Sequence, residues 1–99
     1  YRNLVWAEGT RRGCLIHTPH QTITVREALY QLEERLPETI FARCQRSFVV
    51  NFTHVQEMTG SSLILSDGTE LSLGRGSKAY VLEAYHRFCQ LRYGGGEGT

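Results

Sequence analysis

A chain of 99 residues is long enough for one domain with a modest core and too short for two. Its hydrophobic fraction of 40% and charged fraction of 21% are ordinary for a globular protein, and no apolar run approaches the roughly 20 residues that cross a bilayer. The net charge of +1 gives, as a total, little support for nucleic-acid binding. No signal peptide opens the chain, but this start indicates nothing about location, because the chain begins at Tyr1 and we expect it to be a piece of a longer protein.

The cysteines and histidines argue against two further classes of protein. Cys14, Cys44 and Cys89 are odd in number and show no CxxC spacing, which favours reduced thiols in a cytoplasmic protein over a secreted disulfide scaffold. His17 and His20 lie three apart without a second pair at zinc-finger spacing. We therefore expect no metal ion and no other cofactor.

Basic residues are concentrated in parts of the chain that lack acids. The segments 39–56 and 71–82 contain arginine or lysine and no acid, whereas four of the ten acids fall in 27–38. Ten of the eleven basic residues are arginines, whose planar guanidinium suits both phosphates and guanine edges. A nearly neutral domain with this pattern can present one basic and one acidic face, although ordinary solvated surface explains most such charges.

The first part of the chain is predicted to form an antiparallel pair of strands. Asn3–Ala7 is rich in β-forming residues, Glu8–Gly13 is a glycine-bounded turn, and Cys14–Thr18 returns as a second strand. A further turn is predicted at Pro19–Gln21.

A helix of about three turns is predicted next. Thr24-x-x-Glu27 has the form of a capping box, in which side chains satisfy the free amide groups of a helix start. An apolar stripe continues from it at helical spacing, and Pro37 ends the helix. The exposed face of this helix is acidic. The stripe consists of Val25, Leu29, Leu32 and Leu36.

Short strands fill the middle of the chain. Apolar residues at 40–42 and 48–50 flank the polar connection 43–47, and His54–Met58 is a further strand candidate. A hairpin is predicted around Gly68, where a two-residue loop would divide four leucines between the two faces of the sheet. A three-residue loop with Gly68 in the left-handed conformation keeps them on one buried face, and we expect this bulged form. The leucines are Leu63, Leu65, Leu71 and Leu73.

The end of the chain is predicted to hold a second helix. Ser77 is expected to cap a helix from Lys78 to Phe88, and residues 93–99 are expected to form a flexible glycine-rich tail after a domain at 1–92. The fold class is therefore α+β and strand-rich, with short antiparallel strands or hairpins in small sheets, one well-capped helix and a C-terminal helix.

The segment Phe41–Asn51 carries the most specific motif of the sequence. Its residues FARCQRSFVVN closely resemble the LytTR signature F-x-R-x-H-R-S-[YF]-[IV]-V-N. Upstream, Asn3–Gly9 resembles the family's D-I-x-Y-I-E-x strand; downstream, Leu65–Thr69 and Leu71–Arg75 resemble its hairpin and the following [VI]-S-R step. The order and spacing of these segments along Asn3–Phe88 identify the chain as a member of the LytTR family.

The resemblance implies a mostly β fold that binds double-stranded DNA through loops inserted in the major groove of direct-repeat promoter sites. It implies the output domain of a bacterial two-component response regulator, with an N-terminal receiver domain outside this chain and a first strand truncated before Tyr1. Gln45 departs from the family, where histidine is usual, and Gly74 departs where serine is usual. Neither helix offers a second apolar stripe, so we expect a monomer that pairs on DNA.

Eight residues are candidates for DNA contact. Arg46, in the polar connection, and Arg75, between two glycines, are expected to reach base edges or phosphates. The start of the second helix can hold a phosphate on backbone amides, and arginines at the first hairpin tip are expected to contact DNA as well. The candidates are Arg11, Arg12, Arg43, Gln45, Arg46, Arg75, Ser77 and Lys78.

Two other residues of the motif carry separate expectations. Asn51 is expected to be structural, with its amide bonding local backbone. For Cys44 two interpretations stay open. It is either an inert packed thiol or a partly exposed one whose neighbours Arg43 and Arg46 favour the reactive thiolate.

Other functions receive less support from the residues. A protein-interaction module could use the same loops to sequester a receiver domain or another regulator. Single-stranded RNA binding needs aromatic stacking platforms, whereas Trp6 and the tyrosines lie in apolar contexts. An enzyme is not expected, because the sequence contains no recognisable nucleophile with its base and no glycine-rich phosphate loop before a helix.

Overall fold

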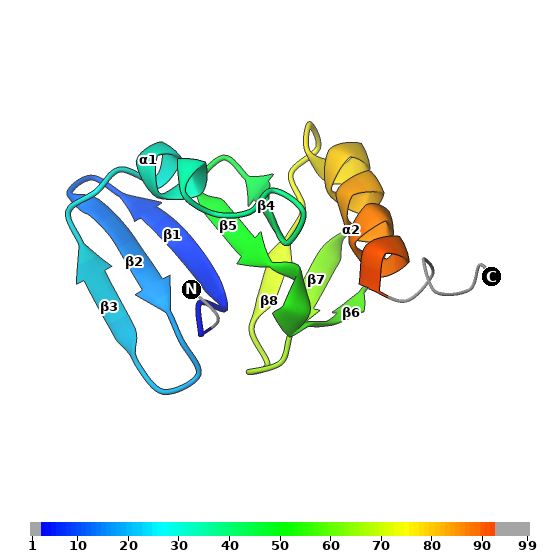
Figure 1. Cartoon of the computed structure of the whole chain (residues 1–99), viewed down its shortest axis with the longest axis horizontal. Coiled ribbons are helices and arrows are strands. Elements are labelled where there is room, and N and C mark those ends of the chain that lie inside the picture. Colours follow the sequence, from blue (N-terminus) through cyan, green and yellow to red (C-terminus); the bar gives the residue numbers. More distant parts are fainter. Residues whose placement is uncertain (1–2, 93–99) are drawn as a thin grey trace.

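The computed structural model describes residues 3–92, which form two antiparallel sheets and two α-helices (Figure 1). The larger sheet has the order β3-β2-β1-β5-β4 and contains β1 (Trp6–Thr10), β2 (Gly13–His17), β3 (Thr22–Val25), β4 (Phe41–Gln45) and β5 (Phe48–Asn51). The smaller sheet has the order β6-β7-β8 and contains β6 (Val55–Met58), β7 (Ser62–Leu65) and β8 (Glu70–Ser72). The helices are α1 (Leu29–Glu34), the short 3-10 helix η1 (Phe52–His54) and α2 (Lys78–Arg92). The predicted strand-rich α+β class is confirmed.

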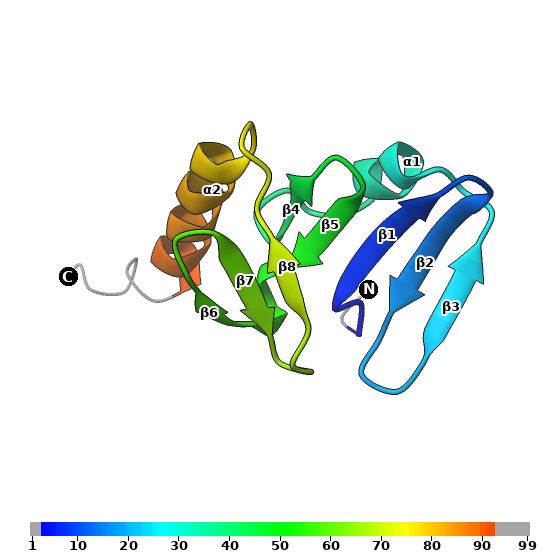
Figure 2. The same cartoon turned by 180° about the vertical axis from the view of Figure 1, so that it is seen from behind.

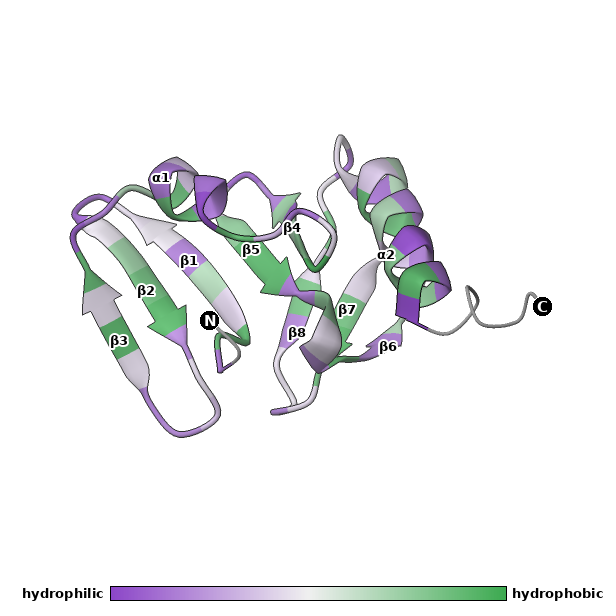
Figure 3. Ribbon diagram, viewed as in Figure 1, coloured by the Kyte–Doolittle hydropathy of each residue, from purple (hydrophilic) through white to green (hydrophobic). Residues whose placement is uncertain are grey.

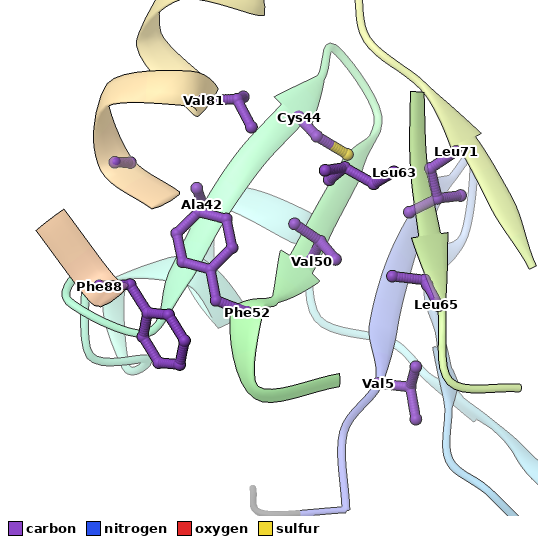
Figure 4. Close-up of a cluster of buried hydrophobic side chains, with 11 residues drawn as sticks. Val5, Ala42, Cys44, Val50, Phe52, Leu63, Leu65, Leu71, Val81 and Phe88 are labelled. Carbon is purple, nitrogen blue, oxygen red and sulfur yellow. The ribbon is translucent and has the colours of Figure 1, made fainter. Parts of the chain in front are cut away.

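One core cluster joins α2 to both sheets (Figure 4). Val81 and Phe88 enter it from α2, and the ring of Phe88 lies 5.6 Å from that of Phe52 between centroids. Leu63 and Leu65 enter from β7 and are completely buried. Because burying one such side chain contributes about 1.5–3 kcal/mol, this cluster fixes α2 and the loop that leads into it.

A second core cluster holds α1 against the other face of the larger sheet. Leu29 and Leu32 of α1 pack there with Phe41 and Val49. Val49 belongs to this cluster and Val50 to the first, since successive side chains of a strand point to opposite faces. The β5 region of the larger sheet is therefore buried on both faces, which makes it a rigid support for the turn before it.

The β7–β8 hairpin has the predicted bulged form. Leu63 pairs with Leu71, and the Leu65 N–H donates to the carbonyl of Thr69 at 2.8 Å, so the loop has three residues. Gly68 has the left-handed conformation, with φ of +91°. The register confirms that the leucines share one buried face, because a two-residue loop would have shifted the pairing by one residue.

The predicted start of the first helix was wrong. Thr24 lies in β3, which pairs with β2 along its whole length, and α1 has only six residues. The first turn is instead closed by Gln31, whose Oε1 accepts a hydrogen bond from the Ala28 N–H at 3.0 Å. The local pattern of Thr24 and Glu27 was outweighed by β-forming side chains that gain a full ladder of hydrogen bonds on the edge of β2.

The first strand and its turn also differ from the prediction. The strand expected at Asn3–Ala7 runs at Trp6–Thr10, so the first turn shrinks to Arg11 and Arg12. The predicted segment before Tyr1 and the tail at 93–99 lie outside the described residues.

Asn51 organises the step from the larger to the smaller sheet. Its Nδ2 donates to the Leu4 carbonyl at 2.8 Å, and its Oδ1 accepts from the N–H and hydroxyl of Thr53 at 2.9 and 2.6 Å. The side chain is buried, so these bonds form away from competing water. They hold the following residues in η1, and the strand predicted from His54 therefore begins at Val55.

Candidate nucleic-acid interface

Three connecting segments lie along one edge of the molecule, at the top of Figures 1 and 2. They are the β1–β2 turn at residues 11–12, the β4–β5 turn at 46–47 and the β8–α2 loop at 73–77. Together with Lys78, the first residue of α2, they are called the turn edge below. The first two turns are hydrophilic (Figure 3), as expected for segments that face water.

Main-chain contacts join the β1–β2 turn to its neighbours. The Gly9 N–H donates to the Ser47 carbonyl at 2.7 Å, which links this hairpin to the β4–β5 turn. Gly13 has φ of +147° and lies so close to β3 that a Cβ atom there would stand 2.0 Å from the Val25 carbonyl oxygen. Only glycine fits this position, because an L side chain would meet both a disfavoured conformation and the backbone of β3.

The β8–α2 loop is tied to the end of β4. The Cys44 carbonyl accepts from the Ser77 hydroxyl at 3.2 Å and from the Gly74 N–H at 3.4 Å. Gln45 Nε2 donates to the Ser72 carbonyl. These bonds position the loop from two sides. Ser77 lies directly before α2, as predicted, but its hydroxyl donates to the Cys44 carbonyl.

Five basic side chains of the turn edge are exposed to solvent. None of them has a salt bridge or a side-chain hydrogen bond to another residue of the described range 3–92. No side chain of this range therefore neutralises their charges, which leaves them available to an anionic ligand. These side chains are Arg11, Arg12, Arg46, Arg75 and Lys78.

Arg43 differs from these five because the protein already occupies its guanidinium. Its Nη2 donates to Glu33 Oε1 at 2.7 Å, and its Nη1 donates to the Arg46 carbonyl at 2.6 Å. Gln45 and Ser77 are occupied as well. The structure thus brings all eight predicted residues to the turn edge or beside it, but three of their side chains bond to the protein itself.

A depression beside the turn edge reveals one arginine that was not predicted. Arg26 follows β3 and lines this depression, but the mistaken capping box had placed it inside a helix. Had the β-branched run 22–25 been predicted as a strand, Arg26 would have been placed directly after the end of that strand. The lining contains five arginines and no carboxylate. The arginines are Arg11, Arg12, Arg26, Arg43 and Arg46.

The thiol of Cys44 lies beneath this surface and not on it. The residue is fully buried in the first core cluster, and its Sγ lies 3.8 Å from the Phe48 carbonyl oxygen. Burial raises the pKa of this thiol to about 11, and a backbone hydrogen bond and the nearby charge of Arg43 oppose the shift only in part. Of the two interpretations of Cys44, the structure supports the inert packed thiol.

Residues 3–92 show neither a metal site nor a membrane span. No three side chains of the metal-ligating types cluster within this range. No helix in the same range combines the length and the apolar composition needed to cross a bilayer.

Comparison with known proteins gives the family. The model of the family described as the LytTr DNA-binding domain matches residues 1–86. The chain belongs to the LytTr DNA-binding domain family. Its class of function is therefore DNA binding in transcription regulation, and the exposed arginines of the turn edge are the structural feature that suits this class.

Two bacterial regulators illustrate the relationship. The LytTr domain is 31% identical over 80 residues to the sensory transduction protein LytT of Bacillus subtilis (strain 168), covering 75% of this chain and 33% of that protein. It is 33% identical over 73 residues to the transcriptional regulatory protein LytR of Staphylococcus aureus (strain N315), covering 68% and 30% respectively. The chain thus spans about a third of the length of the curated relatives it matches.

A solved structure has the same fold. The LytTr DNA-binding domain of a response regulator from Bacillus cereus superposes with a TM-score of 0.75, covering 84% of this chain and 81% of that one. At 24% sequence identity, this likeness establishes a shared arrangement of strands and helices and nothing about individual contact residues.

Proposed function

We propose that this domain binds double-stranded DNA sequence-specifically, with the turn edge as its contact surface. The observation that carries the proposal is the set of five exposed basic side chains on that edge, none paired within residues 3–92. DNA phosphates supply most of the affinity in such complexes, and base edges in the grooves supply the sequence preference. Loops of this edge would enter the major groove.

The positions of the arginines suggest a division of labour between them. Arg46 and Arg75 are carried on short segments tied to β4 and β5, so we assign them to base edges, where bidentate arginine–guanine contacts discriminate between sequences. Arg11, Arg12 and Lys78 flank these two and are assigned to phosphates. Gln45 and Ser77 would adjust the loop or reach DNA only on exchanging their present partners.

The wider setting follows from the family. We propose that the domain is the output part of a two-component response regulator, working in the cytoplasm beside an N-terminal receiver domain and without catalytic activity. We expect the isolated domain to be monomeric and to pair on direct-repeat half-sites. Lengthening the spacing between half-sites by about 5 base pairs, half a helical turn, should then abolish cooperative pairing.

Selection from random DNA duplexes, followed by affinity measurement on the selected site, tests the proposal. We expect Arg46→Ala to weaken specific binding by about 1–3 kcal/mol and to relax the preference at one base position. Arg87→Ala, an exposed arginine of α2 away from the turn edge, is the matched control and should change neither quantity. Failure to select any sequence, or equal effects of the two variants, would refute the assignment.

A salt titration separates this proposal from the protein-interaction alternative. Affinity for DNA falls steeply as salt rises, by a slope of about −0.9 per neutralised phosphate on a double-logarithmic scale. An apolar protein interface on the same loops would respond weakly. Removal of a phosphate-contacting charge by Lys78→Ala should reduce the slope by about 1.

A further inference from the structure

A groove runs between α1 and α2, on residues that do not belong to the turn edge. Two adjoining hollows form it, and they share Glu38 and Tyr80. One hollow follows α2 as far as Leu91, and the other extends over the end of α1 to Glu34. This surface is called the α1–α2 groove below. None of its lining residues lies in the segments that we assign to DNA.

The α2 side of the groove is an apolar stripe whose ends, Tyr80 and Leu91, are exposed and whose middle residue, Ala84, is buried in the first core cluster. Tyr80, Ala84 and Leu91 lie at positions i, i+4 and i+11 of the helix, so they follow one another along one face. Tyr80 is 50% exposed and Leu91 is 69% exposed, whereas the core face of α2 buries Val81 and Phe88. Two of the four exposed large hydrophobic residues in the described range therefore line this one groove.

The α1 side of the groove carries unpaired negative charge. Glu34 and Glu38 are exposed and have no salt bridge or hydrogen-bond partner within residues 3–92. Glu33, also in the lining, is held by Arg43 at 2.7 Å. Among the residues of 3–92 that line the groove, Arg87 is the only basic one, and its Nη2 lies 3.9 Å from Glu83 Oε1. This charge repels phosphates, so the groove does not extend the DNA surface.

We infer that the α1–α2 groove is the docking surface for a basic amphipathic helix of a partner protein. The groove offers an apolar strip along α2 beside free carboxylates, which complements a helix with leucine-like residues on one face and lysine or arginine along its border. The strip spans twelve residues of α2, from Tyr80 to Leu91, which corresponds to about 16 Å along the helix axis and thus to about three turns of a docked helix. DNA on the turn edge would leave this surface accessible.

The test uses a labelled peptide of about 14 residues with leucines on one helical face and lysines elsewhere, a length that covers the groove. Its binding to the whole chain is followed by fluorescence anisotropy. A peptide of the same composition, scrambled so that leucines surround the helix, is the second probe. We expect the amphipathic peptide to bind at least tenfold more tightly than the scrambled one, because only the former presents a continuous apolar face.

Variants then locate the binding site. Reversing two charges with Glu34→Lys and Glu38→Lys should lower the affinity for the amphipathic peptide by about tenfold, because two attractions to its lysines become repulsions. The control reverses two exposed acids of the smaller sheet, Glu57→Lys and Glu70→Lys, and should leave the affinity unchanged. Leu91→Ser should weaken binding without changing the charge. Absence of peptide binding, or equal effects of the two double variants, would overturn the inference.

Sedimentation of the chain alone distinguishes a partner helix from a second copy of this chain as the occupant of the groove. Concentration-dependent dimers that disappear in Leu91→Ser would assign the groove to a second copy of this chain, and this result would also overturn the inference. DNA affinity is measured on the same variants. The groove and the turn edge share no residues, so the two proposals can fail separately. A chain that binds DNA but not the peptide contradicts the docking inference alone. A chain that binds the peptide but not DNA contradicts the proposed function alone.

Discussion

Replacement of Gly13 by alanine is the most direct test of how the turn edge is held. This residue closes the β1–β2 turn with φ of +147°, and a Cβ atom there would lie 2.0 Å from the Val25 carbonyl oxygen and 2.8 Å from the backbone of Arg26. Both neighbours are main-chain atoms, which cannot move aside as the end of a flexible side chain can. The variant must therefore separate β3 from the β1–β2 hairpin or distort both.

The size of the loss follows from two contributions. A non-glycine residue in a sparsely populated conformation costs about 1–3 kcal/mol, and overpacking of a rigid site costs about 1–3 kcal/mol more. Gly13→Ala should then lower the free energy of unfolding by about 2–6 kcal/mol, a large part of the roughly 5–15 kcal/mol that stabilises a natural domain. The melting temperature should fall by at least about 8 °C in a domain of this size.

Two other glycines separate these contributions. Gly68 has φ of +91° but nothing within 4 Å of its would-be Cβ, so Gly68→Ala carries the conformational cost alone. Gly60 has neither a positive φ nor a close neighbour, and Gly60→Ala should be nearly neutral. Urea unfolding of the three variants should rank the losses as Gly13 above Gly68 above Gly60. A loss at Gly13 no greater than that at Gly68 would refute the close approach of β3.

Three further perturbations test the rest of the molecule. Asn51→Ala removes the buried amide that bonds to Leu4, and we expect a loss of about 2–4 kcal/mol in urea unfolding, whereas a loss under about 0.5 kcal/mol would contradict its structural role. Cys44, with its pKa raised to about 11 by burial, should react with a thiol reagent at pH 8 at least about 100-fold more slowly than in the unfolded chain, and fast labelling blocked by DNA would revive a redox role. For Asp67, partial burial is outweighed by hydrogen bonds from Thr69 that lower its pKa, so its contribution to stability is complete at neutral pH and is lost as the pH falls through the lowered pKa. Asp67→Asn should therefore make stability less dependent on pH in the acid range, and an unchanged pH profile would contradict this.

The features predicted correctly from the sequence are those in which local and global preferences agree. In the β7–β8 hairpin, Asp67-Gly68 supplies the turn and the spacing of four leucines demands one buried face, so the register has a single solution. The start of α1 fails for the opposite reason. Thr24 and Glu27 satisfy a local helix signal, but β2 offers a pairing edge that no local pattern displays.

The role of each site residue was harder to predict than its place. The motif locates Arg43, Gln45 and Ser77 near the turn edge, but their partners lie 10, 27 and 33 residues away in the chain. Whether a side chain is free for a ligand depends on such distant neighbours, which spacing and composition do not contain. Arg26 was missed for the related reason that its neighbourhood in space is set by the pairing of β3.

The division between occupied and free side chains explains how a few arginines could read a sequence. The Arg46 carbonyl is held by Arg43, and the loop around Arg75 is held through the Cys44 carbonyl, so both segments are ordered before any ligand arrives. A segment that is already ordered loses less conformational entropy on binding, and more of the contact energy remains for affinity. It also resists adapting to a wrong base, which is the physical basis of discrimination. Arg43→Ala should accordingly impair DNA recognition by loosening the β4–β5 turn, even though its guanidinium is already held by Glu33 and the Arg46 carbonyl.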